Sequence, residues 1–265
     1  MKSRWLHSED SVKVRRGPEM ASSRLSFGHT VARTASPRPT PRDAPSEDAD
    51  RGLRRVGIVD LGSNTARLVV FRTEPGRWFR LVDSIREPVR LAQGMGSDGS
   101  LKPPAMDRAE AALQLFDDYA RGRRLDTLEV IATSAVRDAA NRDEFLERIE
   151  PLDLELRILS GEEEAEYGVL AVANGMTLRD AWVIDVGGGS AQLALMRDRR
   201  CEGGRAYPLG TVRLTEQFLN GKHDPPKKRQ VKAVEETIDE QLGDVAKRMR
   251  EDGLPIVAMG GTVRN

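Results

Sequence analysis

Two segments of the sequence repeat one arrangement: an apolar run, an aspartate, a glycine-containing turn and a second apolar run. The aspartates are Asp60 and Asp185. The turns contain Gly62, Ser63, Asn64 and Thr65 in the first copy, and Gly187, Gly188, Gly189 and Ser190 in the second. Backbone N–H groups in such turns can point into one concavity and bind phosphate oxygens, and glycine leaves room for that approach. A carboxylate at each strand end suits Mg²⁺. The repeat therefore predicts a phosphate site with a divalent cation.

The elements around these turns must bring the two copies together. Apolar patterns predict strands over residues 55–60, 66–72, 78–91, 127–133, 154–159, 181–186, 191–197 and 255–259, and helices over 104–123, 142–150, 161–174, 210–220 and 227–251. This alternation predicts an α/β domain with a largely parallel sheet. One copy of the turn would fit an ordinary β-hairpin. Two copies favour a duplicated domain with a cleft between its halves.

Histidine is missing from the body of the sequence. The three histidines are His7, His29 and His223, and none lies between residues 56 and 222. Ser-His-Asp triads, Cys-His pairs and His-ligated zinc sites are therefore excluded from this region. Acid–base chemistry must use carboxylates, hydroxyls or lysine. The single cysteine, Cys201, cannot form a disulfide within the chain, which suits the cytoplasm.

Five motifs in order resemble the Ppx/GppA family of exopolyphosphatases and guanosine pentaphosphate phosphohydrolases. They are the turn after Asp60, the stretch from Ala132 to Ala139, the stretch from Ser160 to Ala165, the turn after Asp185, and Gly260-Gly261-Thr262. Together they cover residues 55–265, and five ordered motifs are far more specific than one. The resemblance implies an actin-like fold of duplicated ribonuclease-H-like domains.

The resemblance also implies roles for individual residues. Glu164 matches the family's catalytic base, and Asp185 joins it as a catalytic residue. Arg137 matches an arginine that contacts the phosphate chain, with pairing to Asp138 or Asp143 as the structural alternative. Gly260, Gly261 and Thr262 are expected to bind phosphate. The metal ligands are expected to be Asp60, Asp185 and, more weakly, Gln192.

Some residues near these motifs fit a structural role or depart from the family pattern. Ser160 and Glu163 form the pattern of a capping box at a helix start, so the glutamates there can also serve to stabilise the helix. Gln192 stands where the family usually has glutamate, which removes a charge near the metal. Glu166 stands where arginine is common, which weakens binding of a long polyanion. Gly210 and Arg213, at a predicted helix start, are further candidate donors for an anion.

Composition divides the sequence into a tail and a folded part. We expect residues 1–52, rich in Ser, Pro and Arg, to be disordered. Residues 53–178 are expected to form the first half and 179–265 part of the second. Because the sequence stops just after the motif at Gly260, the second half is expected to be incomplete and the chain cut off. Residues 1–55 contain twelve Lys and Arg and seven Asp and Glu, so the remainder is mildly acidic.

The expected activity is Mg²⁺-dependent hydrolysis of a terminal phosphoanhydride. The expected substrate is inorganic polyphosphate or guanosine pentaphosphate. Nucleic acid is not an expected partner, because a mildly acidic fold disfavours binding to a phosphate backbone. A membrane is not expected either, because no apolar run is long enough to span a bilayer. A homodimer is one option for the assembly. The alternatives are an actin-like ATP-dependent kinase and a non-catalytic or truncated protein that binds polyphosphate or nucleotide.

Overall fold

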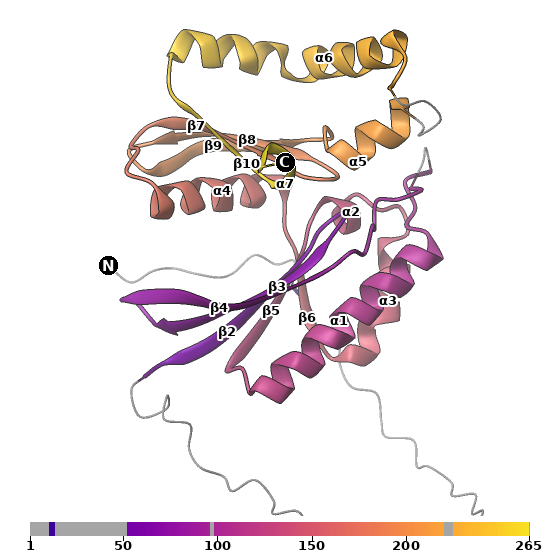
Figure 1. Cartoon of the computed structure of the whole chain (residues 1–265), viewed down its shortest axis with the longest axis vertical. Coiled ribbons are helices and arrows are strands. Elements are labelled where there is room, and N and C mark those ends of the chain that lie inside the picture. The colour runs from indigo at the N-terminus through magenta and orange to yellow at the C-terminus, as the bar shows by residue number, and fades with distance from the viewer. Residues whose placement is uncertain (1–10, 14–51, 96–97, 220–224, 265) are drawn as a thin grey trace, which may run out of the picture.

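The computed structural model describes residues 11–13, 52–95, 98–219 and 225–264, and it contains two halves, each built on one β-sheet (Figure 1). The predicted disordered tail, residues 1–52, lies outside the described residues except at Gly52 and at Ser11–Lys13. Those three residues form strand β1, an element that the sequence did not predict. No helix in the described part of the chain is both long and apolar enough to cross a membrane.

The first half is a six-stranded sheet with the order β1-β6-β5-β2-β3-β4. Its strands after β1 are β2 (Arg54–Leu61), β3 (Ala66–Glu74), β4 (Trp78–Glu87), β5 (Thr127–Ala132) and β6 (Glu155–Ile158). Strands β2, β3 and β4 form an antiparallel meander, whereas β5 and β6 run parallel to β2. Strand β2 therefore lies inside the sheet. The first glycine turn, which follows β2, lies at the end of the strand that faces the second half.

Helices cover one face of the first sheet (Figure 1). They are α1 (Pro103–Arg123), the single-turn α2 (Ser134–Arg137) and α3 (Arg142–Ile149), which continues into a 3-10 turn, η3 (Glu150–Leu152). The apolar side of α1 contributes Met106, Leu113 and Phe116 to a continuous core with the strands. Burial of large apolar side chains is the main force that holds such layers together.

The second half repeats the strand order of the first. Its sheet has the order β10-β7-β8-β9, with β7 (Ala181–Val186), β8 (Ala191–Arg197), β9 (Arg200–Tyr207) and β10 (Ile256–Met259). An antiparallel meander is again followed by a strand parallel to the first, on its other side. The prediction of a duplicated α/β domain is therefore confirmed at the level of topology.

Two helices cover opposite faces of the second sheet. Helix α4 (Gly161–Gly175) lies on the side toward the first half, and α6 (Lys228–Asp252) lies on the far side (Figure 1). Ala165, Val169 and Val172 of α4 form a core with Val183 and Met196 of the sheet. The division expected at residues 178 and 179 thus separates α4 from the sheet that it covers. By packing, the first half ends between β6 and α4.

Most predicted elements are present, with several differences in addition to the unpredicted β1 and α2. Strand β4 ends at Glu87 rather than at residue 91, because Pro88 has no backbone N–H for the ladder. Strand β9 was not predicted. The helix predicted over 210–220 is divided into α5 (Thr211–Leu214) and a π-helical turn, η4 (Thr215–Leu219). A last single turn, α7 (Gly261–Arg264), follows β10.

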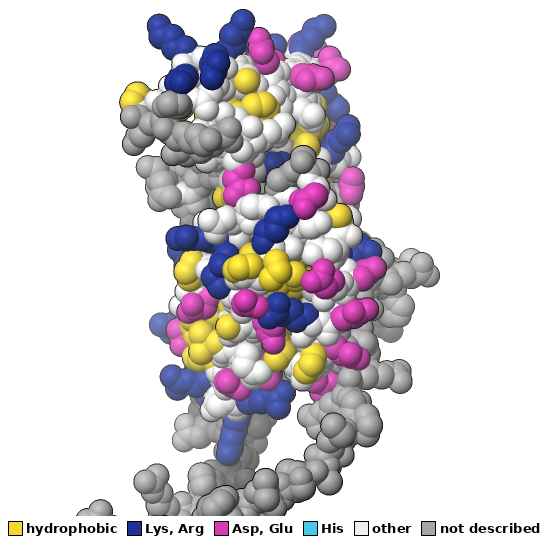
Figure 2. All heavy atoms as spheres, turned by 90° about the vertical axis from the view of Figure 1, so that its right-hand side faces the viewer, with side chains coloured by type: hydrophobic (Ala, Val, Ile, Leu, Met, Phe, Trp, Pro, Cys, Tyr) yellow, Lys and Arg dark blue, Asp and Glu magenta, His cyan; other side chains and the backbone are white. Residues whose placement is uncertain are grey.

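The surface mixes charges of both signs. On the face drawn in Figure 2, Lys and Arg side chains alternate with Asp and Glu side chains over both halves. A nucleic-acid-binding face would instead gather basic side chains into one patch or stripe. This face therefore gives no support to nucleic-acid binding.

Candidate active site

The two glycine turns meet between the halves. The hydroxyls of Ser63, in the first turn, and Ser134, at the start of α2, lie 2.9 Å apart and share a hydrogen bond. A Cβ atom on Gly189 of the second turn would lie 2.4 Å from each of these two oxygens. Real Cβ atoms do not come so close, so any other residue at position 189 would require the two serine hydroxyls to move. The site is therefore composite, with one turn from each half.

The start of α5 fixes the orientation of the second turn. The backbone N–H of Thr211 donates to the carbonyl of Gly187 at 3.0 Å, and that of Val212 donates to the carbonyl of Gly188 at 2.9 Å. The Arg213 Nε donates to the carbonyl of Gly189 at 2.9 Å. In a trans peptide unit the N–H points opposite to the C=O. The backbone N–H groups of Gly188, Gly189 and Ser190 therefore point away from α5. This leaves them available to an anion.

Asp60 and Asp185 end the corresponding strands β2 and β7, and each faces the other half. Asp60 reaches solvent, yet protein atoms closely surround its carboxyl group. These surroundings, together with the negative charge of Asp185, raise the pKa of Asp60 to about 6, while Arg67 acts in the opposite direction. Two adjacent carboxylates that disfavour each other's charge form a donor set that fits a hard divalent cation. Among the described residues no group of three or more acidic, His or Cys side chains is placed so that it could hold a metal ion by itself.

Glu164 lies in the first turn of α4, and the predicted capping box holds that turn in place. The Ser160 hydroxyl accepts the backbone N–H of Glu163 at 3.1 Å, and the Glu163 carboxylate accepts the N–H of Ser160 at 2.9 Å. The next backbone N–H, that of Glu164, begins the helical pattern by donating to the Ser160 carbonyl. Glu163 therefore has the structural role, and Glu164 is free to face the other half.

Two donors hold the Glu164 carboxylate. Arg137 Nη1 donates to Oε2 at 2.5 Å, and Gln192 Nε2 donates to the same oxygen at 3.1 Å. Within the described structure no donor binds Oε1, so this oxygen is available to a water molecule. Burial raises the pKa of Glu164 above its ordinary value, and the hydrogen bond and charge of Arg137 oppose the rise. The group is thus buried, oriented and still able to accept a proton.

The structure brings most of the predicted residues together. Arg137 pairs with Asp138 through Nε at 3.2 Å, as the structural alternative predicted, and it also contacts Glu164, which was not predicted. Asp143 pairs with Arg142 instead. Gln192 lies opposite Asp185 in the β7–β8 ladder, so its side chain is near the second carboxylate. Gly260 also lies near Asp185, since a Cβ on it would be 2.8 Å from Oδ1.

Other residues lie apart from this group or are used differently. Gly261 and Thr262 are exposed after β10, and the Thr262 hydroxyl makes no hydrogen bond within the described residues, so their predicted phosphate binding stays a prediction. Arg213 binds a carbonyl and Asp138 instead of pointing its donors at an anion site. The sequence indicated Ser134 only as a residue at a strand end, where α/β folds place ligands. It indicated Asp138 only as an ion-pair partner of Arg137.

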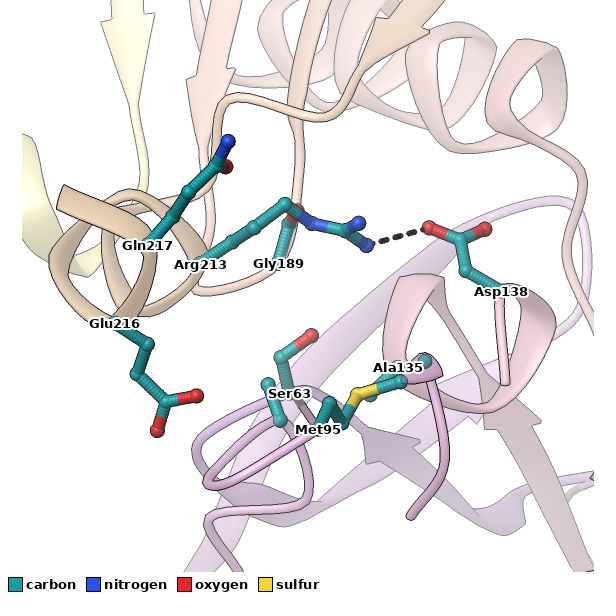
Figure 3. Close-up of a pocket in the computed structure, with 10 residues that line it drawn as sticks. Ser63, Met95, Ala135, Asp138, Gly189, Arg213, Glu216 and Gln217 are labelled. Atoms are coloured by element: carbon teal, nitrogen blue, oxygen red, sulfur yellow. Dashed lines mark hydrogen bonds and ion pairs between the residues drawn. The ribbon is translucent and has the colours of Figure 1, made fainter. Parts of the chain in front are cut away.

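Two cavities lie on either side of this group of residues. The first, of about 480 Å³, is lined from the first half by Ser63, Met95 and Asp138 and from the second by Arg213 and Glu216 (Figure 3). The second, of about 380 Å³, is lined by residues that include Arg137, Ser160, Ser190, Arg205 and Tyr207. Asp60 and Asp185 line neither cavity. The glycine turns and Glu164 therefore lie between two openings.

Comparison with known proteins identifies the family. The model of the Ppx/GppA phosphatase family matches residues 69–264, which is most of the described chain. The chain belongs to the Ppx/GppA phosphatase family. The matched residues contain the second glycine turn, Arg137 and Glu164, and the first turn just precedes them.

Curated and solved Ppx/GppA proteins agree with this assignment. Exopolyphosphatase 1 of Mycobacterium tuberculosis is 32% identical over 208 residues, covering 77% of this chain and 60% of that protein. A crystal structure of the Aquifex aeolicus family member is 27% identical, with a TM-score of 0.59 over 73% of this chain and 63% of that one. An exopolyphosphatase structure from Cytophaga hutchinsonii is 25% identical, with a TM-score of 0.68 over 78% and 66% of the two chains.

These relatives confirm the α/β fold with two sheets, which is that of the Ppx/GppA and actin-like proteins. The chain spans about 60% of the length of the curated relatives that it matches.

Proposed function

We propose that this chain carries the site that hydrolyses the terminal phosphoanhydride bond of inorganic polyphosphate. One observation carries the proposal: two glycine turns face each other across the halves, and Glu164 is held beside them with Oε1 available. Phosphoryl transfer depends chiefly on positioning and on neutralising charge. The turns supply N–H donors for phosphate oxygens, and the glutamate supplies a base for water.

The reaction divides between groups of both halves. A water bound to Glu164 Oε1 attacks the terminal phosphorus, and the carboxylate takes a proton from it. The bond between that phosphorus and the bridging oxygen breaks, which releases orthophosphate and leaves the chain one phosphate shorter. N–H groups of the turns at Ser63 and Gly189 bind the non-bridging oxygens. Arg137 keeps Glu164 ionised and oriented, because its positive charge favours the carboxylate form.

We also propose Mg²⁺ as the cofactor, held by Asp60 and Asp185 with water completing its shell. The raised pKa of Asp60 supports this, since burial and, after it, the charge of Asp185 disfavour the ionised form when no cation is bound. Mg²⁺ commonly uses one or two carboxylates together with substrate phosphates. Gln192 can add its amide oxygen, because its amide nitrogen is used for Glu164 and for Ser190 at 2.7 Å. When bound, the ion would neutralise charge on the transferred phosphate.

Polyphosphate is favoured over guanosine pentaphosphate by the shape and chemistry of the two cavities. A nucleobase stacks best on a free aromatic face. The larger cavity has apolar surface at Ala92, Met95 and Ala135 but no aromatic side chain. The other contains Tyr207, which is buried, and the Arg205 guanidinium covers its ring at 5.3 Å from the centroid. That cavity presents Arg137, Arg205 and two serine hydroxyls, which suit a chain of phosphates, although Asp138 and Glu162 also line it and oppose an anion.

Phosphate release tests the proposal directly. The purified chain is incubated with Mg²⁺ and, in parallel, with polyphosphate of defined length, guanosine pentaphosphate or ATP. We expect release from polyphosphate, lost in Glu164→Gln by about 100-fold or more, the range of general-base catalysis. Glu147→Gln is the control, because Glu147 is exposed on α3 and lines neither cavity.

Other outcomes identify the alternatives. Transfer of the ATP γ-phosphate to an acceptor would favour an actin-like kinase. Binding of polyphosphate without release would favour a binding protein. Equal phosphate release by Glu164→Gln and wild type would indicate a contaminating enzyme and would also favour a binding protein. Release from guanosine pentaphosphate alone would retain the reaction and refute the substrate.

A further inference from the structure

A closed ring of hydrogen bonds surrounds the candidate catalytic groups and crosses between the halves twice. The first crossing joins Arg137 of α2 to Glu164 of α4 at 2.5 Å. The second joins Asp138, next to Arg137, to Arg213 of α5 at 2.8 Å, and Figure 3 draws this contact. Only the first of these crossings involves a residue that our mechanism places in contact with the reacting water.

The remaining members close the ring within the second half. Gln192 Nε2 donates to both Glu164 Oε2 and Ser190 Oγ. Ser190 follows Gly189, whose carbonyl accepts from Arg213 Nε. In order, the ring contains Arg213, Asp138, Arg137, Glu164, Gln192, Ser190 and Gly189, so each member is fixed from both sides.

We propose that Arg213 is a positioning residue, which couples the orientation of the second glycine turn to that of Glu164 through Asp138 and Arg137. This inference rests on the proposed function. The Arg213 guanidinium uses its Nε to hold the turn and its Nη2 to hold the first half. Its planar shape gives it two donors in fixed directions, which lysine cannot offer.

The exposure of the ion pair argues against a role in stability alone. The side chains of Arg213 and Asp138 are 33% and 34% exposed. Ion pairs this exposed contribute little to folding, typically under about 1 kcal/mol. The pair nevertheless links two parts of the site whose relative placement decides the rate, since small displacements of reacting groups are costly. Its effect is therefore expected in turnover more than in folding.

The coupling predicts a specific kinetic result with polyphosphate and Mg²⁺. We expect Arg213→Gln and Asp138→Asn each to lower kcat by about 10- to 100-fold, as for residues that orient a ligand or base from behind. KM should change by less than about threefold, because the glycine turns, Arg137 and Arg205, which are proposed to bind the phosphates, all remain. The double variant should be no slower than the slower single variant, since either change opens the same ring.

Two further variants keep the test decisive. Arg213→Lys retains the charge but not both directed bonds, so it should recover only part of the lost kcat. Arg179→Gln is the matched control, because the Arg179–Asp198 ion pair is also exposed but lies far from the glycine turn. Arg179 precedes β7 and Asp198 follows β8, so the pair is at the opposite end of these strands from the turn. Its kcat should equal that of wild type. Thermal unfolding of every variant verifies that each is folded.

The outcomes separate the two claims. Single variants with wild-type kcat, effects on KM alone, or multiplicative losses in the double variant would overturn the positioning role and leave the phosphatase proposal intact. A folded wild-type chain that releases no phosphate would overturn the proposed function, and the positioning role with it.

Discussion

The approach of α5 to the second glycine turn can be tested with one methyl group. A Cβ on Gly210 would lie 2.2 Å from the carbonyl carbon of Gly189 and 2.3 Å from the carbonyl oxygen of Gly188. Both atoms belong to the backbone, so no side-chain rotation can relieve the contact. Gly210 has φ −71° and ψ 148°, a conformation that alanine adopts freely. Any loss in Gly210→Ala must therefore come from the close approach alone.

The expected magnitude follows from these distances. Ordinary contact needs about 3.4 Å or more, so α5 or the turn must move by about 1 Å. Overpacking of this kind costs about 1–3 kcal/mol. The shift also weakens the bonds that Thr211 and Val212 donate to the turn, each contributing about 0.5–1.5 kcal/mol. We expect a loss of about 2–4 kcal/mol in the free energy of unfolding. A displacement of about 1 Å lowers kcat by about 100-fold.

Urea denaturation and phosphate release measure the two effects. Gly243→Ala is the control, because Gly243 lies within α6 and no atom lies within 4 Å of the position that its new methyl group would take. Alanine there should raise stability by about 0.5–1 kcal/mol through helix propensity. If Gly210→Ala unfolds at the wild-type urea concentration and retains wild-type kcat, the turn does not depend on its contact with α5, and the argument from backbone distances fails.

Three further predictions concern the carboxylates and the helix that carries one of them. Ser160→Ala removes a cap from α4 and should lower stability by about 1 kcal/mol in thermal unfolding, with Ser160→Asp restoring it; an unchanged melting temperature in the alanine variant would contradict the capping role. Without Mg²⁺, the pKa of Asp60 is raised to about 6, so stability should fall as pH rises from about 4 to 6. Carboxyl NMR should show this titration, and Asp185→Asn should move it to lower pH. Burial raises the pKa of Glu164, so its ionised form lowers stability at pH values above the ordinary pKa. At pH 7 the melting temperature of Glu164→Gln should therefore be no lower than that of wild type. A lower melting temperature would mean that the ion pair with Arg137 outweighs the effect of burial.

The sequence could predict whatever depends on local pattern. The two Asp–Gly turns, the capping box at Ser160 and the long helices are all encoded in a few neighbouring residues. The strand order could also be anticipated from the repeat, since two copies of a hairpin fold alike. Strand β9 shows the limit. Its sequence, from Arg200 to Tyr207, contains two glycines and three charged residues and has little apolar alternation.

Long-range packing explains the other differences. Helix α4 directly follows β6, so sequence order assigns it to the first half, yet its apolar side matches the second sheet. The ion pair between Asp138 and Arg213 joins residues that are 75 positions apart. No local pattern distinguishes these two charged side chains from others on the surface. Their role depends on the way the halves meet, which only the three-dimensional arrangement provides.

The passage from β6 to α4 also determines how this protein could be divided. Among the described residues, the polypeptide passes from the first half to the second only here, between Ile158 and Gly161. A break at this link would produce two fragments, each with all the described strands of one sheet. Arg137 would belong to one fragment and Glu164 to the other. The chain could therefore be used as a split reporter, in which the proposed phosphate release would be regained only when the two fragments reassemble.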